Sequence, residues 1–440
     1  MHILLLTCYE LLERSSYSIF TYTQSRINLR FAEVHCLHVV DVTGYGIRSQ
    51  YVYLKEVAEA NFGNAIVRPM SGTLHDLPWV DQGKHSIGEV LCETSWMPPY
   101  RDGAPQAACT RYMARTQLDL LSALGYQLMS GYEAEFFMYH KDGVGDVTSR
   151  PVFLRDDHYS SANMTEHTEL VCWMVDCLCA AGVNVESTHT VTAPGQLEIA
   201  TGPEFGIKST DNMFIIKDAV KEIGILRGLH ATFMTKPVVA HDASQLHFNH
   251  SLWVGDSNVF HDPEKASRGL STLGRRWIAG LLTHAAALSA LCRPTVNCYR
   301  GLVEPLLASK SNWGFEDRKT MLRIVTSSAG KTYVENRLPN GPANPYVVLA
   351  ATVAAGIDGL VNCLEPPSDT QDHSEPLPSS LSQAVSALEA DKVLCDALGE
   401  EFVRWFSTVK REVEIEAVNK AREKGRDEME VERELYFTRL

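Results

Sequence analysis

The sequence predicts an α+β fold, in which a small β-rich region precedes a larger region of helices and polar-faced strands. Short strands and turns fill residues 30–100, and helical periodicity begins only beyond a proline-rich linker. With 440 residues and 45% hydrophobic content, the chain can bury a large core. We therefore expect an unassigned segment at 1–29, a small domain at 30–100 and a large domain at 105–440.

Composition argues against several classes of protein. The chain has 40 basic and 54 acidic residues, a net charge of −14, so we expect no binding to nucleic acid or to anionic membranes. No apolar run reaches the roughly 18 residues of a transmembrane helix, and the opening Met1–Leu6 is too short for a signal peptide. The 11 cysteines form no CxxC pair, so we expect a cytoplasmic protein with reduced thiols.

The expected elements follow in chain order. Strands are predicted at 33–41, 49–53 and 88–93, before a linker that begins at Pro98-Pro99. Helices are predicted at 108–124, 166–181, 211–226, 269–291 and 344–364, with Ser209 or Thr210 capping the third and Asn344-Pro345 starting the last. Residues 365–376 are predicted to form a surface loop, and the charged segment 408–440 a solvated terminal helix.

The stretch Gly131–Tyr139 is the predicted strand around which the site is organised. Residues two apart on a strand share a face, so Glu133 and Glu135 point the same way beside bulky apolar neighbours. Two adjacent carboxylates on a half-buried strand repel each other unless a cation or a proton lies between them. A metal ion fits if other strands supply more ligands.

Three further strands have one polar face. Gln196 and Glu198 share a face, as do His247, Asn249 and Ser251, and as do Glu335 and Arg337. Any one such strand alone is more commonly just solvated, and a lone histidine is more commonly structural. Together, however, these residues form a set of oxygen and imidazole donors suited to Mg²⁺ or Mn²⁺: Glu133, Glu135, Glu198, His247 and Glu335.

Arginines complete the predicted chemistry. Arg318, Arg323 and Arg337 are suited to phosphate or carboxylate groups. A divalent metal, carboxylates and arginines together favour phosphoryl transfer from a nucleotide. The sequence has no Walker loop and no GxGxxG motif, which disfavours P-loop and Rossmann enzymes.

Six ordered motifs resemble the glutamine synthetase family over roughly residues 30–420. They are Gly131-Tyr-Glu-Ala-Glu-Phe-Phe137, Pro194-Gly-Gln-Leu-Glu-Ile199, Ala231-Thr-Phe-Met-Thr-Lys-Pro237, His247 with Ser251-Leu252, Asn297-Cys-Tyr299, and Glu335-Asn-Arg337 with Ala343-Asn-Pro-Tyr346. The resemblance implies an N-terminal β-grasp domain, a catalytic domain with an open antiparallel barrel, and a homo-oligomeric ring such as a dodecamer with sites between subunits. It also implies ATP-dependent joining of glutamate to ammonia.

Roles carried over by the resemblance divide the ligands into two sets. Glu133, His247 and Glu335 would hold the metal that bridges the ATP phosphates, and Glu135 and Glu198 a second metal near glutamate. The arginines Arg318, Arg323 and Arg337 would neutralise the transferring phosphoryl group, with Arg323 also binding the nucleotide, and Ser251 would lie near the nucleotide.

Several positions depart from the family pattern. Thr190 replaces a third carboxylate of the second metal, Gly301 replaces an arginine, and Asn249 replaces a second histidine. The flap with its catalytic Glu is replaced by residues 303–310, although Glu304 and Glu316 lie nearby in the sequence, and the glutamate-binding Asn-Gly reads Asp242-Ala243. The N-terminal ammonium-binding loop is not recognisable around residues 61–64. These changes weaken a metal site and remove a general base together with a lid.

Three functions remain open. The first is a Mg·ATP-binding protein of this family whose ligation of glutamate with ammonia is weak or lost. The second is an active γ-glutamyl ligase that uses another amine. The third is a non-catalytic ring that acts as a scaffold or chaperone-like partner of intermediate filaments. It is implied by the resemblance to one branch of the family, which is carried by short sequence segments such as Trp277–Leu282. Beyond these three, a nucleotide-binding regulatory subunit is a less favoured interpretation.

Overall fold

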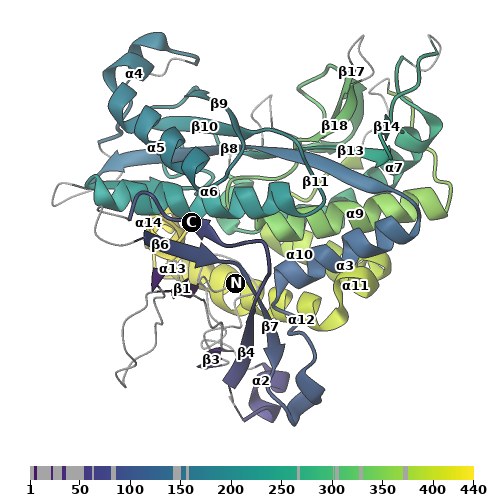
Figure 1. Cartoon of the computed structure of the whole chain (residues 1–440), viewed down its shortest axis with the longest axis horizontal. Helices are drawn as coiled ribbons and strands as arrows, with labels where there is room; N and C mark the ends of the chain where they lie inside the picture. Colours follow the sequence, from purple (N-terminus) through teal and green to yellow (C-terminus); the bar gives the residue numbers. More distant parts are fainter. Residues whose placement is uncertain are drawn as a thin grey trace.

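The computed structural model describes residues 4–6, 21–22, 32–35, 54–61, 64–80, 86–141, 150–154, 158–264, 268–300, 302, 307–326, 331–369 and 375–440. Helices and sheets are mixed throughout the chain, and the main sheet is an open one (Figure 1). The predicted α+β class is therefore confirmed. The predicted strand at 49–53 and position 301 lie outside the described residues, as do 303–306.

A large sheet forms the upper half of the molecule and carries the site (Figure 1). Its strand order is β16-β17-β18-β13-β8-β10-β9, and β11 and β12 also pair with β8, and β14 with β13. All pairs are antiparallel except β16 with β17. The strands are β8 (Gln127–His140), β9 (Val185–Thr190), β10 (Gln196–Thr201), β11 (Glu204–Phe205), β12 (Leu229–Thr232), β13 (Leu246–Val254), β14 (Ser257–Asn258), β16 (Trp313–Phe315), β17 (Leu322–Thr326) and β18 (Thr332–Asn336).

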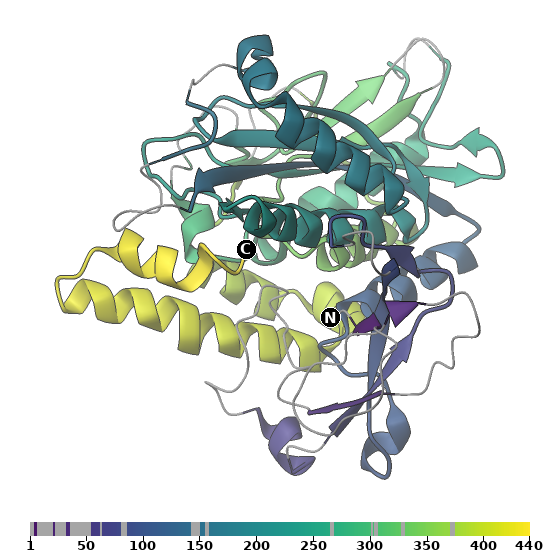
Figure 2. The same ribbon diagram turned by 60° about the vertical axis from the view of Figure 1, so that its left-hand side comes forward.

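Helices pack beneath this sheet because β8 turns its apolar face toward them. Tyr132, Ala134 and Phe136 are fully buried on that face, and the Tyr132 hydroxyl donates to the carbonyl of Pro345. Figure 2 shows α6 between the sheet and the C-terminal helices. The α-helices of this larger part are listed here, and α4 lies above rather than beneath the sheet in Figure 1: α3 (Thr110–Ala123), α4 (Ser161–Glu166), α5 (Thr168–Ala180), α6 (Lys208–Leu226), α7 (Thr272–Thr283), α8 (Ala285–Cys292), α9 (Pro345–Val361), α10 (Leu381–Ala390), α11 (Lys392–Leu398), α12 (Glu400–Val409), α13 (Glu416–Glu423) and α14 (Glu428–Tyr436).

Smaller sheets lie in the N-terminal part. One contains β1 (Leu4–Leu6), β2 (Thr21–Tyr22), β5 (His75–Asp76) and β6 (Ser86–Val90); the other contains β3 (Ala32–His35), β4 (Asn64–Pro69) and β7 (Cys92–Trp96), with helix α2 (Lys55–Glu59) nearby. Another pair joins β15 (Lys310–Ser311) to β19 (Glu375–Pro376). The β-grasp assignment and the domain boundaries stay predictions.

A buried arginine ties β7 to the helical layer. Arg111 of α3 donates two hydrogen bonds of 2.9 Å to the carboxylate of Asp211 and one of 3.0 Å to Glu93 of β7. Tyr346 of α9 donates a further hydrogen bond to Asp211. Because Arg111 is 4% exposed and its guanidinium is fully engaged, removing it would leave the buried carboxylate of Asp211 without its cationic partner and Glu93 with Arg115 alone. The network therefore holds the small sheet, α3, α6 and α9 in one arrangement.

The structure corrects three of the predicted helices. Ser209 and Thr210 lie inside α6 rather than capping it, and they are buried beside Ser130 and Tyr132. The segment 408–440 is not one solvated helix, because it continues α12, turns at Gly425 and buries Lys410, Glu414 and Glu432 completely. By contrast, Asn344 caps α9 ahead of Pro345 as predicted. No helix among the described residues is both long and apolar enough to cross a bilayer.

The predicted helix at 269–291 is broken into α7 and α8 at His284. The two imidazole nitrogens of this 5% exposed residue pair with Asp391 at 2.6 Å and with Asp358 at 3.1 Å. Burial disfavours the charged imidazole, but the hydrogen bonds with both aspartates outweigh it and raise the pKa of His284. His284 therefore joins the break to α9 and to the start of α11.

This ion pair predicts a pH-dependent stability. A histidine whose folded pKa is raised stabilises the fold fully below its unfolded pKa of about 6.5, and this stabilisation is lost as pH rises through the folded pKa. We expect His284→Asn to lower Tm by several degrees at pH 6, with a smaller deficit at pH 9, measured by thermal unfolding. His230→Asn is the matched control, because burial lowers the pKa of His230 and its removal should not cost stability at low pH. A deficit in His284→Asn that is independent of pH would contradict the prediction.

Candidate active site

The candidate site lies on the face of the sheet opposite the helices. Glu133 and Glu135 leave β8 on this face, since the intervening residues of the strand point into the core. The register places His247 of β13 directly opposite Glu133, and Glu198 of β10 directly opposite Glu135. The two carboxylates that share a face along β8 therefore belong to two separate groups across the sheet.

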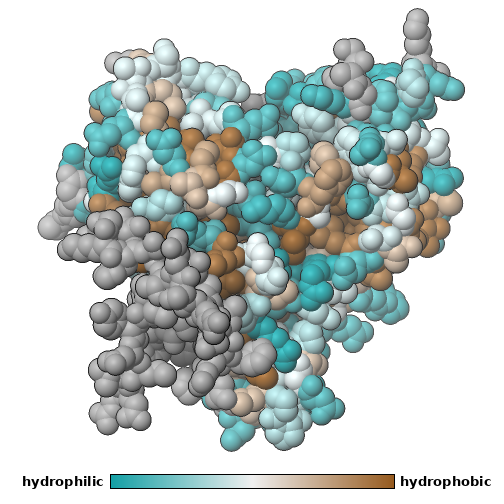
Figure 3. All heavy atoms as spheres, in the orientation of Figure 1, coloured by the Kyte–Doolittle hydropathy of each residue, from teal (hydrophilic) through white to brown (hydrophobic). Residues whose placement is uncertain are grey.

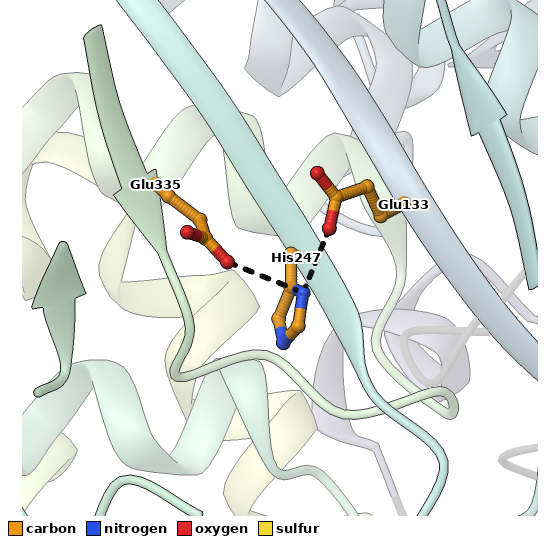
Figure 4. Close-up of side chains that lie close together, drawn as sticks. All are labelled: Glu133, His247 and Glu335. Atoms are coloured by element: carbon orange, nitrogen blue, oxygen red, sulfur yellow. Dashed lines mark hydrogen bonds and ion pairs between the residues drawn. The ribbon is translucent and has the colours of Figure 1, made fainter. Parts of the chain in front are cut away.

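The first group is a triad of possible metal ligands (Figure 4). The His247 Nδ1 atom lies 3.0 Å from Glu133 Oε2 and 3.5 Å from Glu335 Oε1. One ligand atom of each residue lies within 4.8 Å of the others. Ligands at about 2.0–2.5 Å from a shared ion span such distances, and two carboxylates with one imidazole suit Mg²⁺ or Mn²⁺. The residues present thus fit a divalent cation.

The residues of this triad shift one another's pKa values. Burial alone would raise the pKa of Glu133. The hydrogen bonds from His247 and Asn249 outweigh burial and lower the pKa to about 2. Burial and the charge of Arg337 oppose protonation of His247, but its two carboxylate partners raise its pKa. The triad therefore keeps Glu133 ionised, which a cation requires.

Two arginines lie next to Glu335 of the triad. Arg323 of β17 donates to Glu335 Oε2 at 2.8 Å, and Arg337 donates to Glu335 Oε1 at 2.5 Å. The Nε atoms of both arginines, and the Nε2 atom of His247, are buried with no hydrogen-bond partner among the described residues. Because a buried donor without an acceptor is costly, these three donors favour a ligand with several anionic oxygens. Glu316 binds the outer side of Arg323 at 2.6 Å.

The second group contains Glu135 and Glu198. Glu135 Oε2 accepts hydrogen bonds from the Gln196 side chain at 3.1 Å and from the Gln245 backbone at 2.9 Å. Burial and the neighbouring charge of Glu198 raise the pKa of Glu135. Two carboxylates in this environment repel each other, so a second cation or a proton would relieve the pair.

Thr190, the departure from the family pattern at this second group, does not face Glu198. It lies opposite Leu197 in the register of β9 and β10, whereas His189 lies opposite Glu198, with Nε2 3.3 Å from Glu198 Oε1. Thr190 is 1% exposed, and its hydroxyl accepts a hydrogen bond from the Ser160 backbone at 2.9 Å. An imidazole therefore takes the place beside Glu198.

All nine residues predicted for the site line one cavity of about 1140 Å³, although their roles stay predictions; they are Glu133, Glu135, Glu198, His247, Ser251, Arg318, Arg323, Glu335 and Arg337. Asp242 and Ala243 also line it, and Asn249 donates to Glu133 at 2.9 Å. In the space-filling view the upper surface is hollowed between two lobes (Figure 3).

Sequence reasoning missed several cavity residues. Tyr333 shares its strand face with Glu335 and Arg337, so the two-residue period of β18 could have found it. Trp253 donates to Ser251 at 2.9 Å and meets the half-exposed ring of Phe205 edge to face. His158 and Tyr159 precede a helix in an irregular segment, and no periodic pattern could place them in the cavity.

The fold and the cavity define a class of α+β proteins in which an open antiparallel sheet presents carboxylates, an imidazole and arginines to one cleft. Residues 107–432 match the family described as glutamine synthetase, catalytic domain. The chain is 35% identical to human lengsin over 375 residues, which cover 82% of this chain and 70% of lengsin. It is 33% identical to glutamine synthetase of Thermotoga maritima over 355 residues, covering 77% and 79% of the two chains. The chain belongs to the glutamine synthetase family.

Solved structures agree with this assignment. A novel glutamine synthase homolog superposes with a TM-score of 0.74 at 22% identity, covering 86% of each chain. A GmaS/ADP complex superposes with a TM-score of 0.71 at 26% identity, covering 83% of this chain and 84% of that one. The predicted likeness to lengsin is confirmed: besides the human protein, rat lengsin is 33% identical to the chain and is matched over 61% of its length.

Proposed function

We propose that this protein binds Mg·ATP in the cleft and that its ATP-dependent ligation of glutamate with ammonia is weak. Enzymes of the glutamine synthetase family use ATP and divalent metal ions. The observation that carries the proposal is the triad of Glu133, His247 and Glu335 beside buried arginine Nε donors that have no hydrogen-bond partner in the described part of the chain. A bound divalent ion would supply charge neutralisation for the phosphates.

The arrangement of aromatic and basic side chains along the cleft suits a nucleotide. Ser251, Trp253 and the exposed ring of Phe205 lie at the end of β13 away from His247, where an aromatic base can stack. Arg323 and Arg337 present donors to phosphate oxygens at the other side of the triad. A structural neighbour of this chain has been solved as a complex with ADP.

Weak ligation with ammonia follows from the second group. Glu135 and Glu198 lie opposite each other, and the sequence has Thr190 where the family has the third carboxylate; affinity for a hard cation falls with the number of anionic ligands. The sequence also lacks the flap Glu and carries Gly301 where the family has an arginine. Losing a transition-state arginine can slow phosphoryl transfer by about 10³-fold.

A thermal-shift titration with Mg·ATP tests the proposal. We expect saturating Mg·ATP to raise Tm by several degrees, since a ligand at about 100 times its Kd stabilises the fold by about 2.7 kcal/mol. Glu133→Gln keeps the size of the side chain but removes its charge, and should abolish the Mg-dependent part of the shift.

Glu186→Gln is the matched control. Glu186 lines the same cavity but lies outside the triad, so its substitution should leave the shift intact. No stabilisation by Mg·ATP, or an equal shift in wild type and in Glu133→Gln, would overturn the proposal.

The γ-glutamyl ligase that uses an amine other than ammonia is a second candidate, favoured by the altered surroundings of Glu198. Family members bind ATP and glutamate and form rings, so we propose a homo-oligomeric ring here also. The scaffold function with intermediate-filament partners stays a prediction, because no observation on the described residues bears on it.

A further inference from the structure

The cleft has opposite chemistry at its two sides. The sheet order runs from β17, which carries Arg323, and β18, which Arg337 directly follows, through the triad to β10 and β9, which carry Glu198 and His189. Strands in a sheet lie about 4.8 Å apart, so the β9 side is about 10 Å from β8. Phosphates suit the arginine side. At the other side the carboxylates of Glu135 and Glu198 suit a cationic group, although His189 pairs with Glu198 and Arg318 is close enough to His158 to act on its charge.

Three rings gather at the β9 side. The Tyr159 ring lies 4.2 Å from the ring of His158 and 4.3 Å from the ring of His189, measured between centroids. Tyr159 is 69% exposed, and all three residues line the cavity. Both imidazole rings are tilted against the tyrosine ring, and an exposed aromatic ring packed against two others in this way can present a π face to a ligand.

The backbone of Tyr159 adopts a strained conformation. Its φ of +54° lies in the left-handed region, which a bulky residue adopts only when its surroundings enforce it. Thr190 supplies that enforcement: its carbonyl accepts from the Tyr159 backbone at 3.1 Å, and its hydroxyl accepts from the Ser160 backbone at 2.9 Å. The residue that departs from the family's metal-ligand pattern therefore positions the aromatic group.

From this arrangement we infer that the ring cluster of His158, Tyr159 and His189, with Glu198, is an acceptor subsite for a primary amine that carries an aromatic body. The ring of the amine would stack on Tyr159, and its nitrogen would lie on the side of Glu198 and Glu135. Aromatic pairs contribute about 0.5–1.5 kcal/mol beyond their buried area, so a planar ring is preferred over a saturated one.

This inference rests on the second candidate function, the γ-glutamyl ligase that uses an amine other than ammonia, which supplies the activated acyl group. The amine nitrogen would form a bond to the γ-carbonyl carbon of the acyl phosphate made from glutamate and ATP. The bond from that carbon to the phosphate oxygen would break, and phosphate would leave with the electron pair. The amine, bound as its cation, would lose one proton to solvent before the attack and a second proton after it. The product is a γ-glutamyl amide.

Calorimetric titration of the full chain with benzylamine, cyclohexylmethylamine and ammonium chloride tests the subsite. Each titration is run with and without Mg·ATP, so that failure of nucleotide binding and failure of amine binding are seen separately. We expect benzylamine to bind at least fivefold more tightly than its saturated counterpart. Tyr159→Ala should abolish this preference and Tyr159→Phe should keep it, with Tyr112→Ala, a tyrosine outside the cavity, as the matched control.

Thr190 is tested as a positioning residue. Thr190→Val keeps the shape but removes the hydroxyl, so it should raise the Kd of benzylamine severalfold without changing the Mg·ATP shift, and Thr190→Ser should restore binding. Equal binding of the two amines, or an unchanged preference in a folded Tyr159→Ala protein, would overturn the inference. So would tighter binding of ammonium than of benzylamine.

Discussion

Replacing Arg337 with lysine is expected to slow ATP-dependent phosphate release about 10³-fold, because arginines at phosphoryl-transfer sites contribute factors of that size. Arg337 is 5% exposed, donates to Glu335, and keeps an unpartnered Nε donor in the wall of the cleft. Lysine preserves the charge but not the planar fork that binds two phosphate oxygens at once. Phosphate release is measured with glutamate and an amine at saturating Mg·ATP.

The matched control is Arg268→Lys. Arg268 pairs with Asp369 at 2.6 Å outside the cavity, and its replacement should leave the rate unchanged. We expect Arg337→Lys to fold, because the lysine still offers Glu335 a positive partner. Thermal unfolding checks that it does. Equal rates for a folded Arg337→Lys and the wild type would contradict the assignment of Arg337 to the phosphoryl group.

Replacing Gly280 with alanine is expected to destabilise the fold by about 3 kcal/mol or more, the upper range for overpacking a core. A Cβ atom at Gly280 of α7 would lie 2.0 Å from the carbonyl oxygen of Ala355 in α9. Gly359 of α9 faces it, and a Cβ there would lie 2.1 Å from the carbonyl of Arg276. Since backbone atoms cannot rotate away, the two helices would have to separate.

Gly224→Ala is the control for helix propensity. A Cβ at Gly224 of α6 would find its nearest neighbour at 3.4 Å, an ordinary contact. We expect this substitution to be neutral or to stabilise by up to about 1 kcal/mol, the propensity difference between glycine and alanine. Urea denaturation measures both variants, and a similar midpoint for Gly280→Ala and wild type would show that the helices do not pack as closely as described.

Separating α7 from α9 would also affect the candidate site. The first residue of α9, Pro345, accepts the hydroxyl of Tyr132, the neighbour of Glu133 on β8. Displacing α9 should therefore disturb the strand that carries the triad, and a folded Gly280→Ala protein should show a smaller Mg·ATP shift.

Long-range contacts explain the elements that sequence reasoning placed wrongly. The apolar run at 269–291 looks like one helix, but His284 interrupts it to pair with aspartates 74 and 107 residues further along the chain. The charged C-terminal segment looks solvated, yet Glu432 is buried because Asn297 and Arg300 donate to it. In both cases the partner is distant in sequence, so no local pattern reports it.

Local spacing alone determined that Glu133 and Glu135 share a polar face, because side chains alternate along a strand whatever surrounds it. The same alternation identified the faces of Glu198, His247 and Glu335. Only the tertiary structure decided which of these acids are neighbours, and it put His189 rather than residue 190 beside Glu198. The physical reason is that a strand's own residues decide which way its side chains point, whereas the register of pairing with other strands decides what they meet.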